Sequence, residues 1–315
     1  MISITLVELE ILGLIKRLMR DYEIVWESIQ PEGASPTQVL ANLIEEIKRK
    51  GLPRGQSLES VVAQLRDQVR SAVDSVGGLP LNNREKQENL LRAAEAMVVI
   101  YQHMPIYDKG EDVKASRARC AWEASKYYGW AAQPKYPVAR NDRQRYLPLF
   151  TKWLAEALWQ DAAYARAKYR ETRRQALIID LLTQNPPLLA QLRGGGAISS
   201  AALGELTPLP RITDEPATDP VNVTAYDADF WHSHSYHFAF AEIFRKQGQW
   251  QDALTAIETA VWLMPRITYR KRLVQFLEDY AKECRNSNRS SCEALRRRAD
   301  SERKRLRAEG ILNIP

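Results

Sequence analysis

The sequence predicts an all-α protein, built as a helical bundle or an α-solenoid. Apolar residues recur three or four positions apart through most of the chain, which is the spacing of one helix face. Capping residues, prolines and glycines separate these segments at intervals typical of helices. No segment shows the alternating, β-branched pattern that predicts strands. We therefore expect little or no sheet.

Successive helices are expected before residue 129. The first covers residues 4–20, where Leu or Ile recurs every three positions. The second starts at Ser35, a capping residue, with Pro36 in the first helical position, and it ends at Gly51. The same reasoning places further helices between Ser57 and Gly77 and at residues 84–103 and 113–128.

Glycine and proline divide the rest of the chain. Residues 129–147 are predicted to be a loop, and one long helix is expected from about Pro148 to Thr183. Residues 193–222 are rich in glycine and proline, which predicts a linker or an ordered loop that wraps the surface. We therefore predict a helical N-terminal domain at 1–192 and a helical C-terminal domain at 223–315.

Residues 231–265 predict a helical hairpin. One helix is expected at 234–246 and a second at 249–263, with Gly248 between them. The hairpin resembles a tetratricopeptide repeat in its length and in its pattern of small and aromatic residues. The matching positions are Ala241, Phe244, Gly248, Trp250, Ala253, Ala260 and Pro265, while His237 and Ile257 depart from the pattern.

The resemblance implies a protein or peptide partner, bound on the concave side of the repeat. The positions of the first helix that would face this side are Ser235, Phe238, Glu242, Arg245 and Lys246. The segment that follows Pro265 does not keep the repeat pattern, so the next helix is either a degenerate repeat or a packing helix. The helices of residues 1–190 are likewise either degenerate repeats or a separate bundle.

Basic residues concentrate at the C-terminal end. The net charge is +6, and residues 266–315 contain 14 basic and seven acidic residues. Two helix faces are candidates for nucleic acid or an acidic partner, the alternative being solvated charge. Their residues are Arg166, Arg170, Arg173 and Arg174, then Arg297, Arg298, Lys304 and Arg305. The apolar stripe of the C-terminal helix, Leu295, Ala299 and Leu306, is expected to be too thin to bury much.

Metal and catalytic signals are weak. His232, His234 and His237 lie within six residues, but no remote cluster supplies further ligands, so solvated imidazoles are favoured over a metal site. No phosphate-binding loop or hydrolase motif is present, and no motif marks Cys120 as a nucleophile. We expect no cofactor, and an enzyme is disfavoured.

Three cysteines suggest a reducing compartment, and Cys284 and Cys292 are expected to be free thiols rather than a disulfide. No stretch is long and apolar enough to predict membrane insertion, so a cytoplasmic protein is expected. The leading hypothesis is a helical scaffold or adaptor. The alternatives are a nucleic-acid-associated protein and, less favoured, an enzyme or metalloprotein that uses the histidines.

Overall fold

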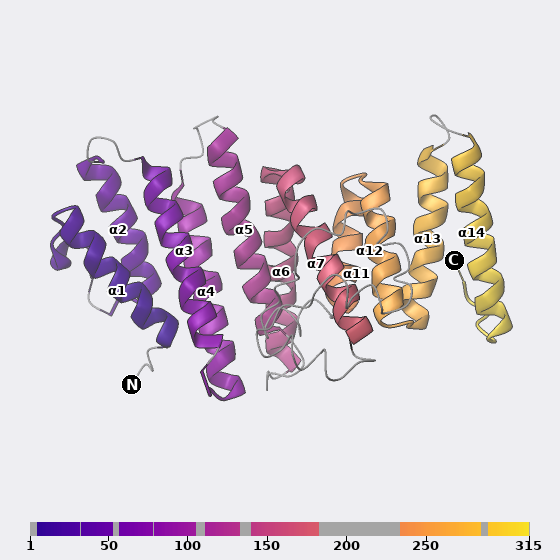
Figure 1. The fold of residues 1–315 in the computed structure, drawn as a ribbon, viewed down its shortest axis with the longest axis horizontal. Coiled ribbons are helices and arrows are strands. Elements are labelled where there is room, and N and C mark those ends of the chain that lie inside the picture. Colours follow the sequence, from indigo (N-terminus) through magenta and orange to yellow (C-terminus); the bar gives the residue numbers. More distant parts are fainter. Residues whose placement is uncertain are drawn as a thin grey trace. The chain divides into compact units, whose positions relative to one another are not determined.

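The computed structural model describes residues 5–31, 33–52, 57–77, 79–104, 111–132, 140–182, 234–284 and 289–314. Within these ranges the chain forms α-helices and short 3-10 turns but no strand, which confirms the predicted fold class (Figure 1). The chain divides into two compact units, unit 1 at residues 1–167 and unit 2 at residues 168–315. The predicted linker at 193–222 lies outside the described residues, so the predicted domain boundary stays a prediction.

Unit 1 contains the helices that the first half of the sequence predicts. They are α1 (Leu6–Asp21), the 3-10 turn η1 (Trp26–Ser28), α2 (Pro36–Lys50), α3 (Leu58–Gly77), α4 (Asn83–His103), α5 (Glu111–Ala131), α6 (Arg140–Gln160) and the start of α7 (Ala162–Leu182).

Local hydrogen bonds explain where the first helices begin and end. The Thr5 hydroxyl accepts the Glu8 amide while the Glu8 carboxylate accepts the Thr5 amide, which caps α1. Ser35 caps α2 ahead of Pro36, as predicted. Helix α2 ends at Gly51, whose φ of 85° lies in the left-handed region that glycine adopts without a Cβ clash.

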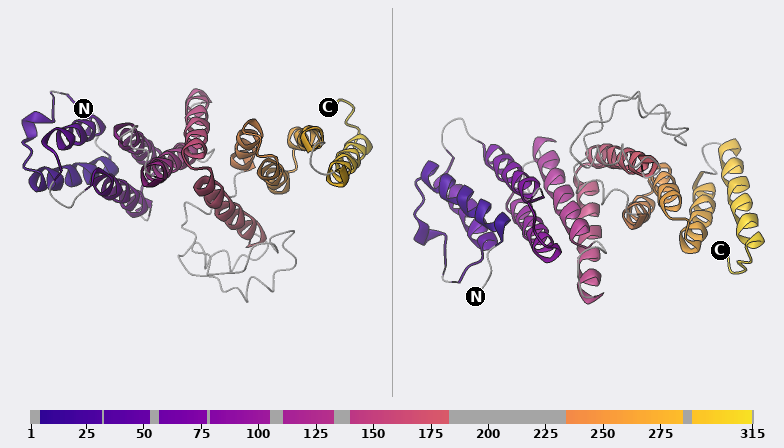
Figure 2. Two further views of the ribbon diagram at one scale, coloured as in Figure 1. Left: turned by 90° about the horizontal axis from the view of Figure 1, so that it is seen from above. Right: turned by 60° about the horizontal axis from the view of Figure 1, so that its bottom comes forward.

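The helices of unit 1 pack as consecutive hairpins, α1/α2, α3/α4 and α5/α6 (Figure 2). First helices contact first helices, because α1 packs on α3 and α3 on α5, while α2 packs on α4. Helix α4 also packs along α5. Stacked hairpins of this kind bury a continuous apolar layer, as in an α-solenoid. That layer includes Ile15, Leu43, Leu65, Met97, Trp122 and Leu154.

A buried arginine fastens α5 to the end of α4. The Nη1 atom of Arg117 lies 3.5 Å from the carbonyl oxygens of both Tyr101 and Met104, and it donates to them. The Arg117 guanidinium also lies 4.1 Å from the centre of the Tyr101 ring. A cation at this position supplies donors to carbonyl oxygens where the hydrogen bonding within α4 ends, and it complements the helix dipole.

The structure corrects the prediction for residues 129–183. Helix α6 already begins at Arg140 and contains Pro148, whereas a loop was expected up to residue 147. The expected single helix is divided at Asp161, whose carboxylate accepts the Tyr164 amide at 2.9 Å. An aspartate in this role caps a new helix, so α7 starts at Ala162.

In unit 2, α7 continues and is followed in the described residues by α11 (His234–Lys246), α12 (Trp250–Leu263), α13 (Ile267–Glu283) and α14 (Arg289–Ala308). Helices α11 and α12 form the predicted hairpin, with Gly248 at a φ of 71° in the turn. Ala241, Ala253 and Ala260 are fully buried, so these small side chains allow the two helices to approach closely. Tyr169 of α7 packs on the Phe240 ring at 4.3 Å.

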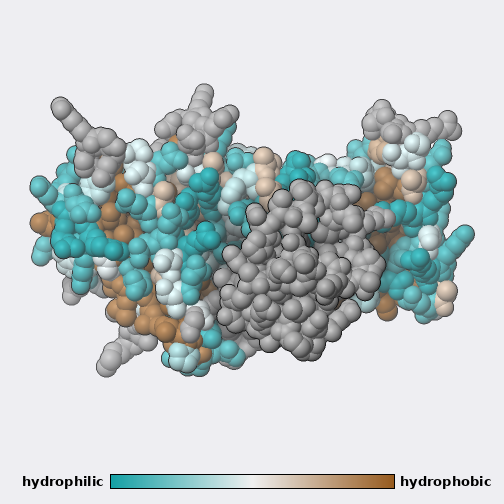
Figure 3. All heavy atoms as spheres, in the orientation of Figure 1, coloured by the Kyte–Doolittle hydropathy of each residue, from teal (hydrophilic) through white to brown (hydrophobic). Residues whose placement is uncertain are grey.

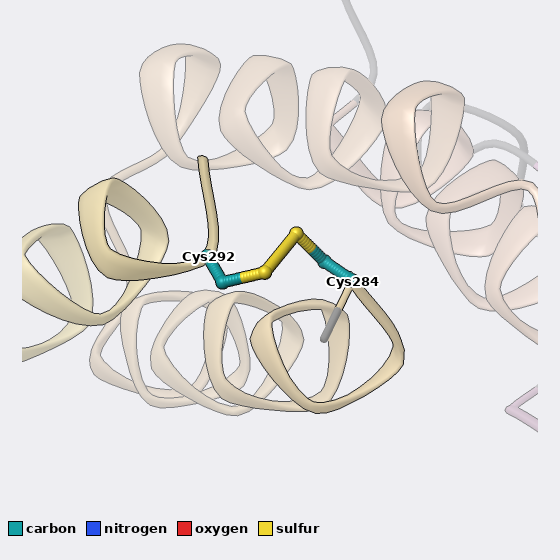
Figure 4. The surroundings of a disulfide bond; sticks show 2 residues. All are labelled: Cys284 and Cys292. Atoms are coloured by element: carbon teal, nitrogen blue, oxygen red, sulfur yellow. A yellow bond between two sulfur atoms is a disulfide. The ribbon is translucent and has the colours of Figure 1, made fainter. Parts of the chain in front are cut away.

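Helices α13 and α14 form a second hairpin, and here two expectations are wrong. Cys284 and Cys292 form a disulfide, with Cα atoms 5.7 Å apart, where the end of α13 lies close to the start of α14 (Figure 4). The apolar stripe of α14 is also buried, since it packs on α13: Leu306 is 0% exposed. The C-terminal helix is therefore part of the core of unit 2.

Candidate partner-binding surface

The predicted partner-binding residues lie along α11, and they differ in how far their side chains are exposed to solvent. Ser235 and Lys246 are exposed, at the start and the end of the helix. Phe238, Glu242 and Arg245 are half-buried, and each of them contacts a side chain of α13. The face of α11 that was expected to be open to a partner is thus shared with the next hairpin.

Aromatic side chains join α11 to α13 at one end of this face. The rings of Phe238 and Tyr269 stack, with centroids 4.7 Å apart and planes 23° apart. The Tyr269 hydroxyl also forms a 2.8 Å hydrogen bond with Nδ1 of His234. Tyr269 is buried, so its hydroxyl is satisfied by the neighbouring helix rather than by bulk solvent.

Charged side chains join the two helices at the other end. Arg272 donates to both carboxylate oxygens of Glu242, at 2.5 and 2.7 Å, and this hydrogen bonding raises the pKa of the Arg272 guanidinium. Arg245 lies 3.4 Å from Asp279. The guanidinium carbons of Arg245 and Arg272 also lie 5.7 and 5.5 Å from the centre of the Phe276 ring. Opposite charges therefore pair along one strip of the surface, over the buried Phe276 ring.

The α13 residues of this strip were not predicted as partner-binding residues from the sequence, although the repeat length points to them. A shift by the length of one repeat carries Ser235, Phe238, Glu242 and Arg245 onto Tyr269, Arg272, Phe276 and Asp279. By sequence the repeat pattern fades after residue 265, because Gln275 and Glu278 do not match it. We define the α11–α13 surface as these eight residues together with Lys246.

The histidine cluster is divided in the structure. Nδ1 of the fully buried His237 lies 3.1 Å from the Tyr169 hydroxyl, while His234 is hydrogen-bonded to Tyr269. His232 lies outside the described residues. Among the residues that the structure describes, no group of three His, Cys, Asp or Glu side chains could hold a metal ion.

The candidate arginine face of α7 is partly engaged. Arg173 donates from Nε to the Thr259 hydroxyl at 2.9 Å, which ties α7 to α12 within unit 2. Arg166 is half-buried and Arg170 is exposed, whereas the side chain of Arg174 lies outside the described part.

On α14, Arg297, Lys304 and Arg305 are exposed. Their neighbour Arg298 pairs with Glu258 of α12, and Arg303 pairs with Glu278 of α13. The Arg305 side chain is 72% exposed, and its guanidinium lies 3.7 Å from the Glu302 carboxylate. Part of the basic charge thus serves packing, and part faces solvent.

No protein-family model, curated protein or solved structure matches this chain. None of the described helices combines the length and the apolar composition that crossing a membrane requires. The described surface in Figure 3 is mostly hydrophilic on the face shown, with smaller hydrophobic areas among the hydrophilic ones. The function must therefore be argued from the surfaces themselves.

Proposed function

We propose that this protein is a helical scaffold or adaptor that binds a peptide segment of a protein partner on the α11–α13 surface. The observation that carries the proposal is the equivalence between the two helices. Positions one repeat apart on α11 and α13 occupy the same strip, and they combine stacked rings with half-buried ion pairs. First helices of stacked hairpins supply the binding surface in repeat proteins.

Charge favours an acidic segment in this partner. The α11–α13 surface contains three cations, Arg245, Lys246 and Arg272, and two carboxylates, Glu242 and Asp279. A peptide carboxylate that approaches Lys246 and Arg245 would gain attraction, and it would also compete with Asp279 for the Arg245 guanidinium, 3.4 Å away. The half-buried Phe238 ring, which stacks on the buried Tyr269, offers an apolar contact at the other end of the strip.

The first experiment uses the whole chain as bait to capture partners from native extract, with and without nuclease. Calorimetry then measures the binding of an acidic peptide from the captured protein. Replacing Arg245 and Lys246 by alanine should weaken binding at least tenfold, as loss of charge-assisted hydrogen bonds does, while the chain stays folded. The matched control is Lys16→Ala with Arg17→Ala, an exposed basic pair on α1. Equal affinity in both double variants would refute the proposed surface.

A second candidate function is nucleic-acid association through α14. The observation that favours it is the exposure of Arg297, Lys304 and Arg305 on one helix. Affinity for duplex DNA should then fall with salt, with a log–log slope of about −0.9 per phosphate neutralised. Alanine at these three positions should reduce that slope, and a capture that survives nuclease treatment unchanged would argue for the adaptor instead.

A further inference from the structure

A small cavity lies in unit 1, where the starts of α3 and α5 meet the end of α4. Its volume is about 120 Å³. This is room for one small organic group, since a cavity of roughly 150 Å³ holds a benzene molecule. Four of the side chains that line the cavity are apolar: Leu58 and Val62 of α3, Met104 directly after α4, and Val113 of α5. Val62 and Met104 are buried, whereas Leu58 and Val113 are half-buried and lie nearer to solvent.

A carboxylate and two hydroxyl groups line the same cavity. The hydroxyl of the buried Ser116 donates to one carboxylate oxygen of the half-buried Glu59 at 2.9 Å. The hydroxyl oxygen of Ser57 accepts the Ser60 amide at 3.1 Å. The second oxygen of Glu59 and the remaining lone pairs of the two hydroxyl oxygens are left as acceptors for a donor that enters the cavity.

Glu59 forms no ion pair with any basic residue in the part of the chain that the structure describes. On α5, Arg117 donates to the carbonyl oxygens of Tyr101 and Met104, and Lys114 is exposed. Glu59 belongs to the first turn of α3, where the helix dipole favours a negative charge even without a cation beside it. A cation that reached this half-buried carboxylate would gain more than it would at a fully exposed one.

We propose that this cavity binds a primary alkylammonium group, such as the end of a lysine side chain. The apolar walls take the methylene stem, while the ammonium donates to the Glu59 carboxylate and to the two hydroxyl oxygens. A guanidinium fits less well, because Ser116 already occupies one of the two carboxylate oxygens that a bidentate pair would use. The site belongs to unit 1 and is independent of the function proposed for the α11–α13 surface.

The test is NMR of the full chain with carbon-13 in its methionine methyl groups, because Met104 in the cavity wall gives a local signal. Met104→Leu assigns that signal by removing it. The probes are n-butylammonium and n-butanol, which share one stem and differ in charge. The ammonium should shift the Met104 signal at a concentration at least tenfold lower, since it alone pairs with Glu59. An unmoved signal, or an equal response to both probes, overturns the proposal.

Peptides then identify the source of the ammonium group. A short peptide with a single lysine is compared with versions that carry arginine or norleucine at the same position. Tighter binding of the lysine peptide than of n-butylammonium identifies a protein segment as the ligand, and the reverse order identifies a small amine. An arginine peptide that binds as tightly as the lysine peptide contradicts the assignment to an ammonium group.

Variants locate the site. Glu59→Gln keeps the shape of the side chain and removes its charge, so it should weaken n-butylammonium binding at least tenfold and leave n-butanol binding nearly unchanged. Glu10→Gln, at an exposed carboxylate of α1, is the matched control. Val113→Phe fills the cavity and should abolish both responses, which tests the site even if Glu59→Gln does not fold. Ammonium binding that persists in Glu59→Gln and Val113→Phe, or that is lost in Glu10→Gln, excludes this cavity.

The double variant Arg245→Ala with Lys246→Ala separates this proposal from the function proposed for unit 2. It should bind n-butylammonium as the parent chain does, whether or not it still captures a partner on the α11–α13 surface. Loss of ammonium binding in this variant would place the ammonium site in unit 2 and overturn the assignment to the cavity.

Discussion

Phe238 of α11 stacks on Tyr269 of α13, with ring centroids 4.7 Å apart. The contact joins the first helices of two consecutive hairpins, beside the ion pairs that Arg272 and Arg245 form with Glu242 and Asp279. Hairpins linked in this way keep their first-helix faces side by side. The stacked pair therefore contributes to the cohesion of unit 2 and lies within the proposed binding surface.

A double-mutant cycle should measure this aromatic contact. Phe238→Leu and Tyr269→Leu keep apolar volume but remove the ring stacking, so the coupling free energy should be about 0.5–1.5 kcal/mol. Urea unfolding of the parent chain, the two single variants and the double variant provides it. Strict additivity of the single effects would show that the two rings do not interact in solution.

The contact between α11 and α12 should tolerate no side chain larger than alanine at position 253. Ala253 is fully buried against α11, so Ala253→Leu should overpack it and lower the free energy of unfolding by about 1–3 kcal/mol. Gln251→Leu on the exposed side of α12 is the control for an added leucine. Chemical denaturation compares the two, and an unchanged midpoint for Ala253→Leu would contradict the close approach of the helices.

The C-terminal helix should contribute strongly to stability, contrary to the sequence-based expectation. Leu306 is 0% exposed, whereas Leu312, just beyond α14, is 85% exposed. Leu306→Ala should therefore destabilise unit 2 by about 2–5 kcal/mol, and Leu312→Ala should have little effect. Thermal melts of the two variants test this difference. Equal melting temperatures would mean that α14 does not pack on α13.

The disulfide should stabilise the hairpin that it closes. Cys284 and Cys292 are eight residues apart, and closing a loop of this size contributes about 2–3 kcal/mol by restricting the unfolded chain. Cys292→Ser should lower the denaturation midpoint accordingly. Thiol titration of the unfolded, unreduced chain should find one free thiol, Cys120. A titration that finds three would restore the prediction of free cysteines.

Alkaline pH should destabilise unit 1 through its buried thiol. Burial raises the pKa of Cys120 from 9.0 to about 12. Above pH 9 the unfolded chain loses this proton while the folded chain keeps it, so stability is full below about pH 9 and falls as pH rises towards 12. The slope that Cys120 adds approaches about 1.4 kcal/mol per pH unit. Urea unfolding of Cys120→Ala at pH 8–11 should show a shallower decline, and an identical slope would exclude the effect.

The sequence by itself determined the all-α class and most helix positions, because these depend on local signals. Apolar spacing, the Ser35 cap with Pro36, and Gly51 define α2, for example, without reference to any other part of the chain. The α11/α12 hairpin was predictable for the same reason: its small residues, Gly248 and its length form one local pattern. The division at Asp161 is also encoded locally, but Pro148, a residue typical of helix starts, lies inside α6 and conceals it.

Only the tertiary structure decided which faces meet. The pairing of Phe238 with Tyr269 depends on how α13 packs beside α11, and a single-helix pattern does not contain that information. The burial of Leu306 depends likewise on the complementary stripe of α13, so a thin stripe was underestimated. The disulfide required the ends of two helices to lie 5.7 Å apart between Cα atoms. Such contacts join segments that are distant in sequence. Their packing energy depends on both segments, so the pattern of either segment alone does not predict them.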